Sequence, residues 1–267
     1  MKLTQPLLII LCLTFNCAFG QARPEVIILG AMKKEIQPIL NNIHIQKTGT
    51  IHKIPYTLGT LEQHPVIVAQ TGIGNVNAAI VTSTLINYFH PKWVIFSGIA
   101  GALQKNLNSE NIVIATKTFD VNFGQYTSKG NEFSLTSRNP IRNAVLPLEY
   151  ESSSTLVHLA QQLAKKNKHM ILGTVATDQH FPNNKAKDPI LMNNNVAAKA
   201  MEDSGIAQAC WLFHIGFISI RAISDNIATK QAYTEKSAET ASNKAAEVTL
   251  KLVDLIFKQQ GFTPRVN

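Results

Sequence analysis

Hydrophobic positions along the chain change repeatedly between a strand-like and a helix-like spacing. Short apolar or alternating runs predict strands, and runs with apolar residues three and four positions apart predict helices. The expected strands are 25–29, 51–58, 65–70, 93–96, 112–115, 171–176 and 217–223, and the expected helices are 32–40, 75–89, 154–166, 201–211 and 230–259. Strands that alternate with helices are typical of a sheet covered on both faces. We therefore expect an α/β fold, a single three-layer α/β/α domain with a central, mostly parallel mixed sheet.

The first twenty residues have a different pattern from the rest of the chain. Lys2 precedes an apolar run at 7–15, and small residues at 18–20 provide a site for a signal peptidase. The run is shorter than the roughly 20 apolar residues that span a bilayer, which disfavours an uncleaved anchor. We expect residues 1–20 to be a cleaved signal peptide and 24–260 to form one domain. The mature protein is then periplasmic or secreted, with no membrane attachment.

Composition and charge narrow the classes of partner and cofactor. The 267 residues carry a formal net charge of +8, but the basic residues are scattered along the chain. The densest group, 165–168, falls at an expected helix end, where cations suit the helix dipole. We therefore expect no nucleic-acid partner. Cys210 is the only cysteine after the signal peptide, so no intramolecular disulfide is expected. The histidines show no ligand spacing, and we expect no metal and no cofactor.

Small and polar residues follow several of the expected strands. They are found at 30–32, 71–74, 97–101 and 224–225. Each group alone is consistent with a tight turn. Because ligands bind where the strands of an α/β sheet end, four such groups together indicate a binding site at that edge.

Six segments, taken in order, resemble the purine nucleoside phosphorylase and nucleosidase superfamily. Within it they are most similar to the methylthioadenosine/S-adenosylhomocysteine nucleosidases. The segments are 28–35, 71–74, 97–101, 173–181, 201–202 and 221–225, and the resemblance extends from about residue 26 to residue 255. It implies a nucleoside phosphorylase-like fold, a small-molecule purine nucleoside as substrate, and a homodimer in which the partner helps to close the pocket.

The resemblance also implies roles for three carboxyl groups. Asp225 is similar to the aspartate that donates a proton to purine N7, and Ser224 holds its carboxyl group. Glu35 matches the glutamate that activates the attacking water, and Glu202 the one that accepts hydrogen bonds from the ribose hydroxyls. The chemistry supports such a set. Breaking an N-glycosidic bond builds positive charge on the sugar and negative charge on the base, so an acid is needed at the base and a nucleophile at the sugar.

The remaining pocket walls are implied in the same way. Met201 lies against the ribose, and Phe181 stacks on the purine beside the backbone of Pro182. Met32, Ile73, Ala100 and Gly101 complete the walls. Other interpretations stay open from the residues alone: Asp225 as a helix N-cap, Glu35 and Glu202 as exposed helix residues, and Phe181 and Met201 as core.

Four positions depart from the family's pattern: Ile99 replaces a small residue, Gln179 replaces an expected Asp, and Ala200 and Pro182 also differ. Ala200 stands before Met201 where relatives usually carry an acidic residue, so part of the polar network at the sugar is missing. Pro182 has no backbone N–H to offer to adenine.

We expect hydrolysis of adenine nucleosides of the 5'-methylthioadenosine or S-adenosylhomocysteine type. A phosphorylase is the nearest alternative, but it needs arginines for phosphate, and none occurs from 24 to 137. Arg221 is shared with the nucleosidases and is expected to support the site. A noncatalytic exported binding or storage protein is the second alternative; the signal peptide and Ala200 favour it, and retention of all three carboxyl groups opposes it.

Overall fold

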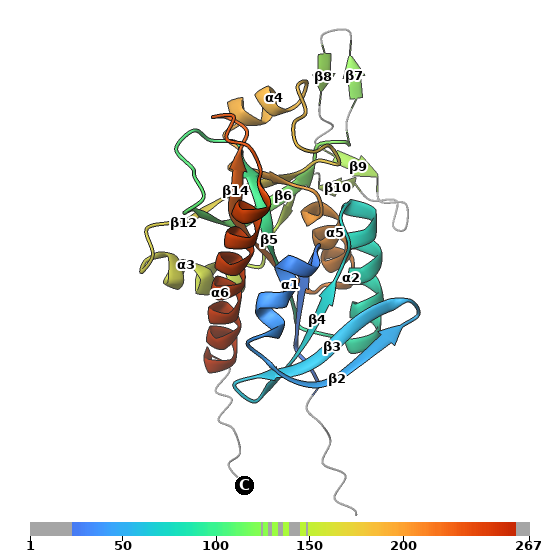
Figure 1. Ribbon diagram of the computed structural model, residues 1–267. Coiled ribbons are helices and arrows are strands. Elements are labelled where there is room, and N and C mark those ends of the chain that lie inside the picture. Colours follow the sequence, from blue (N-terminus) through green and yellow to red (C-terminus); the bar gives the residue numbers. More distant parts are fainter. Residues whose placement is uncertain are drawn as a thin grey trace, which may run out of the picture.

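The computed structural model describes residues 23–123, 125–127, 130–132, 136–138, 145–147 and 149–259. The expected signal peptide at 1–20 lies outside the described residues. In chain order the elements are β1 (Val26–Gly30), α1 (Lys33–Leu40), β2 (His44–Ile51), β3 (Ile54–Leu61), β4 (His64–Gln70), α2 (Asn75–Phe89), β5 (Trp93–Ala102), β6 (Ile112–Asp120), β7 (Gln125–Thr127), β8 (Gly130–Glu132), β9 (Thr136–Arg138), β10 (Val145–Pro147), β11 (Glu149–Glu151), α3 (Ser154–Ala164), β12 (Met170–Thr177), α4 (Asp188–Asn193), β13 (Ala198–Ala200), α5 (Asp203–Phe213), β14 (Gly216–Asn226) and α6 (Glu235–Gln259) (Figure 1).

The main sheet is mixed, with β5 at its centre. β1 lies between β4 and β5 and is parallel to both. β14 is also parallel to β5 and pairs with its other edge. Antiparallel pairs join β3 to β4, β2 to β3, and β13 to β5. The pairings β5–β14, β14–β6, β6–β12, β12–β13 and β13–β5 close a ring of five strands. β5 therefore has β13 and β14 as neighbours at its carboxyl end.

Helices cover both faces of this sheet, as the α/β/α expectation required (Figure 1). The side chains of β1 alternate between two buried clusters: Val26 and Ile28 pack in one, and Ile27 and Leu29 in the other. The first cluster contains residues of α1, α3 and α6, and the second contains residues of α2 and α5. A strand that is apolar on both faces needs a helix layer on each side, so the expected fold class is confirmed.

Several expected elements needed correction in their extent; for example, the strand expected at 112–115 continues to Asp120 as β6. The segment 51–58, expected to be a single strand, spans the turn of the hairpin formed by β2 and β3. The prediction missed β2 because this strand is mostly exposed and its polar residues lack an alternating pattern. The segments 97–101 and 224–225 were expected to follow the strands 93–96 and 217–223, but they continue these strands as parts of β5 and β14, so the alternative of a tight turn is wrong there. Small residues there allow close packing of strands rather than a change of direction.

The long closing helix begins at Glu235 and not at residue 230. Thr234 Oγ1 accepts a hydrogen bond from the Ser237 backbone N–H at 3.0 Å, which is the geometry of an N-cap. The sequence analysis missed α4 and β13, which are too short to show a period. No helix within the described residues has the length and apolar character needed to cross a membrane.

Candidate active site

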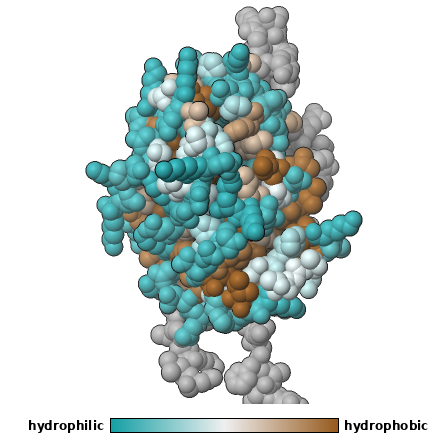
Figure 2. Space-filling model, in the orientation of Figure 1, coloured by the Kyte–Doolittle hydropathy of each residue, from teal (hydrophilic) through white to brown (hydrophobic). Residues whose placement is uncertain are grey.

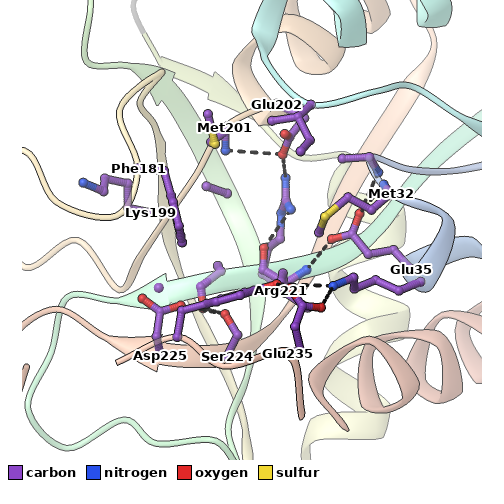
Figure 3. A pocket seen from close by; sticks show the side chains of 18 residues that line it. Met32, Glu35, Phe181, Lys199, Met201, Glu202, Arg221, Ser224, Asp225 and Glu235 are labelled. Atoms are coloured by element: carbon purple, nitrogen blue, oxygen red, sulfur yellow. Dashed lines mark hydrogen bonds and ion pairs between the residues drawn. The ribbon is translucent and has the colours of Figure 1, made fainter. Parts of the chain in front are cut away.

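A cavity of about 470 Å³ opens at the carboxyl end of β5 (Figure 3). Ten of the residues named from the sequence line it: Met32, Glu35, Ile73, Ala100, Gly101, Phe181, Met201, Glu202, Ser224 and Asp225. Pro182 borders a smaller adjoining cavity instead. The structure therefore brings together side chains from six separate parts of the chain. Among the described residues, no group of three His, Cys, Asp or Glu side chains is arranged to hold a metal ion.

Glu35 is buried at the start of α1, so its interpretation as an exposed helix residue is wrong. Its Oε2 accepts hydrogen bonds from the backbone N–H groups of Ala31 at 2.7 Å and Met32 at 2.9 Å. Its Oε1 accepts one from Ile99 N–H at 2.9 Å. Burial raises the pKa of Glu35 to about 7, against the lowering effects of Arg221 and these N–H groups. The carboxyl group is thus poised to lose or gain a proton near neutral pH.

Gly98 makes room for the two charged groups at this end of the cavity. A Cβ on Gly98 would lie 2.6 Å from Glu35 Oε1 and 2.8 Å from Arg221 Nη1. Both distances are shorter than real contacts, so only glycine lets the carboxylate and the guanidinium converge there.

Arg221 is fully buried on β14 and links the acidic residues of the site. Its Nη2 donates to Glu202 Oε2 at 3.0 Å and to Asp203 Oδ2 at 2.5 Å, and Nη1 donates to the Ile99 carbonyl at 2.9 Å. The guanidinium also lies 4.2 Å from the centre of the Phe96 ring. Burial opposes its charge, but Asp203 and Glu202 hold the pKa of Arg221 above its usual range.

Glu202 is buried immediately before α5, so its interpretation as an exposed residue is also wrong. Besides the bond from Arg221, its Oε1 accepts a hydrogen bond from Gly74 N–H at 3.1 Å. This contact ties the glycine-rich segment before α2 to the site. Met201, beside it, lines the cavity, and Ala200 presents only a methyl group there.

Asp225 lies at the other end of the cavity, beside Phe181 (Figure 3). It belongs to β14, and α6 begins ten residues later, so it is not an N-cap. Ser224 Oγ donates to Asp225 Oδ1 at 2.7 Å. Burial raises the pKa of Asp225, although the Ser224 hydrogen bond and the charge of Lys199 oppose the rise.

Two contacts lie at the mouth of the cavity. The Phe181 ring is 59% exposed, so it is not core, and it meets Tyr233 edge to face with centroids 5.5 Å apart. Lys34 forms an ion pair with Glu235 and lies 3.3 Å from the Tyr233 hydroxyl. The ion pair joins the start of α1 to the start of α6.

Comparison with known proteins identifies the family of the chain. The family model of the Phosphorylase superfamily matches residues 25–257. The chain belongs to this superfamily.

Its relatives include the nucleosidases that the sequence motifs resemble, which confirms that resemblance. The 5'-methylthioadenosine/S-adenosylhomocysteine nucleosidase of Geobacillus sp. (strain WCH70) is 32% identical over 242 residues, covering 88% of this chain and 100% of the relative. Two solved nucleosidases of the same description have similar structures. The Helicobacter pylori protein, with butyl-thio-DADMe-Immucillin-A, has a TM-score of 0.76 at 25% identity and covers 86% of this chain and 97% of its own. The Neisseria meningitidis protein, with methylthio-immucillin-A, has a TM-score of 0.74 at 26% identity and covers 86% and 98%.

Sequence reasoning missed several residues of this superfamily site. Lys34, Lys199, Asp203, Tyr233 and Glu235 are not among the residues predicted from the sequence. Asp203 directly follows Glu202, and an acidic pair at a helix start is a signal that could have been used. Tyr233 and Glu235 lie in a segment that was assigned to a helix, which hid their position at the cavity mouth.

Replacement of Glu35 by glutamine tests how the burial of this carboxyl group changes the free energy of unfolding with pH. Because the pKa of Glu35 in the folded protein exceeds the unfolded value of 4.5, the folded state binds more protons. Stability therefore falls as the pH rises through that interval, by about 1.4 kcal/mol per pKa unit. Between about pH 4 and about pH 8, the free energy of unfolding of the wild type should fall by about 3 kcal/mol more than that of E35Q.

Urea unfolding at each pH measures this difference. The matched control is Glu151→Gln, an exposed carboxyl group outside the cavity, which should follow the wild type. Parallel curves for E35Q and the wild type would contradict the burial argument.

Proposed function

We propose that this protein hydrolyses the N-glycosidic bond of adenine nucleosides of the 5'-methylthioadenosine/S-adenosylhomocysteine type, releasing free base and a ribose derivative. One observation carries the proposal: Glu35, Glu202 and Asp225, far apart in the chain, all line the same cavity. Asp225 lies beside Phe181 at one end, and Glu35 and Glu202 lie near Arg221 at the other (Figure 3). An acid for the base and two carboxylates for the sugar are thus held apart, as the reaction requires.

The reaction follows from these positions. Asp225 donates its proton to N7 as the bond between C1' and N9 breaks, so the bonding electrons leave on a neutral base. Glu35 accepts a proton from water as the water oxygen bonds to C1'. Glu202 accepts hydrogen bonds from the ribose hydroxyls and stabilises the positive charge that develops on the sugar. The raised pKa of Asp225 supports its role as a proton donor, and that of Glu35, about 7, supports proton acceptance near neutral pH.

Water, rather than phosphate, is the nucleophile that the charges favour. Three cations line the cavity in the described part of the chain, and each already has an acidic partner: Lys34 with Glu235, Lys199 with Asp188, and Arg221 with Glu202 and Asp203. A phosphate dianion at the sugar would also face the carboxylates of Glu35 and Glu202. Repulsion by these groups disfavours phosphate, while a neutral water is accepted.

Phosphate dependence is the direct test. The mature protein should release adenine from 5'-methylthioadenosine and S-adenosylhomocysteine at the same rate with and without inorganic phosphate, because water is the co-substrate. Chromatography of the free base measures the rate, and the sugar product should carry no phosphate. Release that requires phosphate would establish a phosphorylase, and tight binding without release would establish a storage protein.

Asp225→Asn tests the proton donor. An amide cannot transfer a proton to N7, so kcat should fall by a factor of about 10² to 10⁴, the range for general acid catalysis. The substitution keeps the shape of the side chain, and Tm should change little. Asp254→Asn, on the surface of α6, is the matched control and should retain wild-type kcat. A D225N enzyme with normal kcat would remove Asp225 from the mechanism.

The proposed function also includes export from the cytoplasm and assembly into a dimer. Residues 1–20 have the pattern of a cleaved signal peptide, and the amino-terminal residue of protein isolated from its host tests the cleavage. We propose that the mature protein is a periplasmic or secreted homodimer. The support for the dimer is an exposed apolar stripe formed by Ile73, which lies just before α2, and by Val76 and Ile80 on α2; they are 51%, 70% and 57% exposed. On the face seen in Figure 2, hydrophobic side chains gather on the side where α2 lies.

Because Ile73 also lines the cavity, a second copy seated on the stripe would reach the cavity mouth. Val76→Asp should therefore convert dimers to monomers and raise KM, since a charge would be buried in an apolar interface. Light scattering after size-exclusion chromatography gives the mass, and Ile45→Asp, on the exposed strand β2, is the control. A fully active wild-type monomer at micromolar concentration would refute the dimer.

A further inference from the structure

Two charged side chains lie on either side of Gly101 at the base end of the cavity. In the sheet register Gly101 is paired with Lys199 of β13 on one side and with Asp225 of β14 on the other. Directly paired residues of neighbouring strands point to the same face of a sheet. A Cβ on Gly101 would lie 2.9 Å from Asp225 Oδ2, so Asp225 projects over the same face. Lys199 and Asp225 therefore lie on the same face of the sheet, and Gly101 places no side chain of its own between them.

Lys199 is a buried cation, 6% exposed, with unused hydrogen-bonding capacity. Its Nζ donates to Asp188 Oδ1 at 2.6 Å and lies 3.7 Å from Asp178 Oδ2. An ammonium group has three N–H donors, so at least one is not taken by these two carboxylates. Lys199 lines the main cavity and also an adjoining cavity of about 30 Å³, which has room for one small group.

Pro182 borders the same small cavity, together with Phe181 and Asp225. A proline has a carbonyl acceptor but no N–H donor. Adenine presents a lone pair at N1 and would need a donor there. A 6-oxopurine carries hydrogen on N1 and suits an acceptor. The residues that border the base end thus combine a spare donor on Lys199 with a backbone acceptor at Pro182.

We propose that this base site accepts 6-oxopurine nucleosides as well as adenine nucleosides, with Lys199 as the residue that determines this specificity. The inference rests on the proposed nucleosidase function. With N7 at Asp225, the substituent on C6 lies on the same edge of the base and points toward the small cavity. A 6-oxopurine presents two adjacent acceptors on that edge, O6 and N7, whereas adenine presents a donor and an acceptor. Protonated Asp225 and the ammonium of Lys199 supply the two donors that the 6-oxopurine needs.

The decisive experiment compares two substrates that differ only at C6, 5'-methylthioadenosine and 5'-methylthioinosine. The kcat/KM of the wild-type protein for the inosine compound should lie within about tenfold of the value for the adenosine compound. No variant is needed for this step, so a folding defect cannot obscure the result. Release of hypoxanthine and adenine is followed by chromatography.

The variant Lys199→Met then tests whether Lys199 determines the preference between the two substrates. Methionine has a similar length but no donor, so kcat/KM should fall for both substrates and at least about tenfold further for the inosine compound. The ratio of the two values is the readout, because general damage to the site lowers both equally. Lys185→Met, an exposed lysine of the segment that carries Phe181 and Pro182 and one that does not line the cavity, is the matched control and should leave the ratio unchanged. Pro182→Ala restores an N–H on the exposed loop and should move the ratio toward adenine.

The outcomes separate this inference from the proposed function. If adenine is released and the inosine compound is cleaved more than about a thousandfold more slowly, the inference is overturned and the nucleosidase function stands. If neither compound is cleaved, the proposed nucleosidase function is refuted, and the inference that rests on it is refuted too. If K199M lowers both values by the same factor, Lys199 has only a structural role and its assignment is overturned.

Discussion

The site depends on one buried guanidinium. Arg221 is surrounded by three acidic side chains, with Glu202 and Asp203 bound to it directly and Glu35 approaching it over Gly98. Without the cation, these carboxylates would repel one another at close range and in a buried environment. Arg221 also binds the Ile99 carbonyl, and Ile99 donates its N–H to Glu35. The guanidinium thus fixes the positions of Glu35 and Glu202, the two groups that we propose to act on the sugar.

The two ends of the cavity differ in how their acids are held. At the sugar end, Glu35 is bound by three backbone N–H groups and faces a cation, yet its burial still raises its pKa to about 7. At the base end, Asp225 has one hydrogen bond from Ser224 and a more distant cation in Lys199. Burial therefore raises the pKa of both carboxyl groups, and the neighbouring hydrogen-bond donors and cations limit the rise. Such a site costs stability, which is a common property of functional centres.

The segment that carries Phe181 and Pro182 is held by hydrogen bonds and an ion pair to two aspartates, Asp178 and Asp188. Asp178 accepts hydrogen bonds from His180 at 2.8 Å and Asn184 at 3.0 Å, and these bonds lower its pKa although its burial has the opposite effect. Lys199 connects Asp188 to β13. The segment that carries Phe181 and Pro182 is therefore anchored at both ends, while the Phe181 ring itself stays exposed at the mouth.

The amino-acid sequence is sufficient to predict most of the helices and strands and to single out three acidic residues. The bounds of α2 agree with the prediction, because its apolar spacing and the His90-Pro91 stop are local signals. Glu35, Glu202 and Asp225 were named because they belong to short motifs. The lengths of the strands, the position of Gly101 between β13 and β14, and the burial of Asp203 and Lys199 beside the cavity follow instead from tertiary packing. Those outcomes depend on partners far away in the chain, such as Arg221 for Asp203 and Gly101 for Lys199. Local spacing carries no information on such pairs, because they form only when the sheet brings distant strands together.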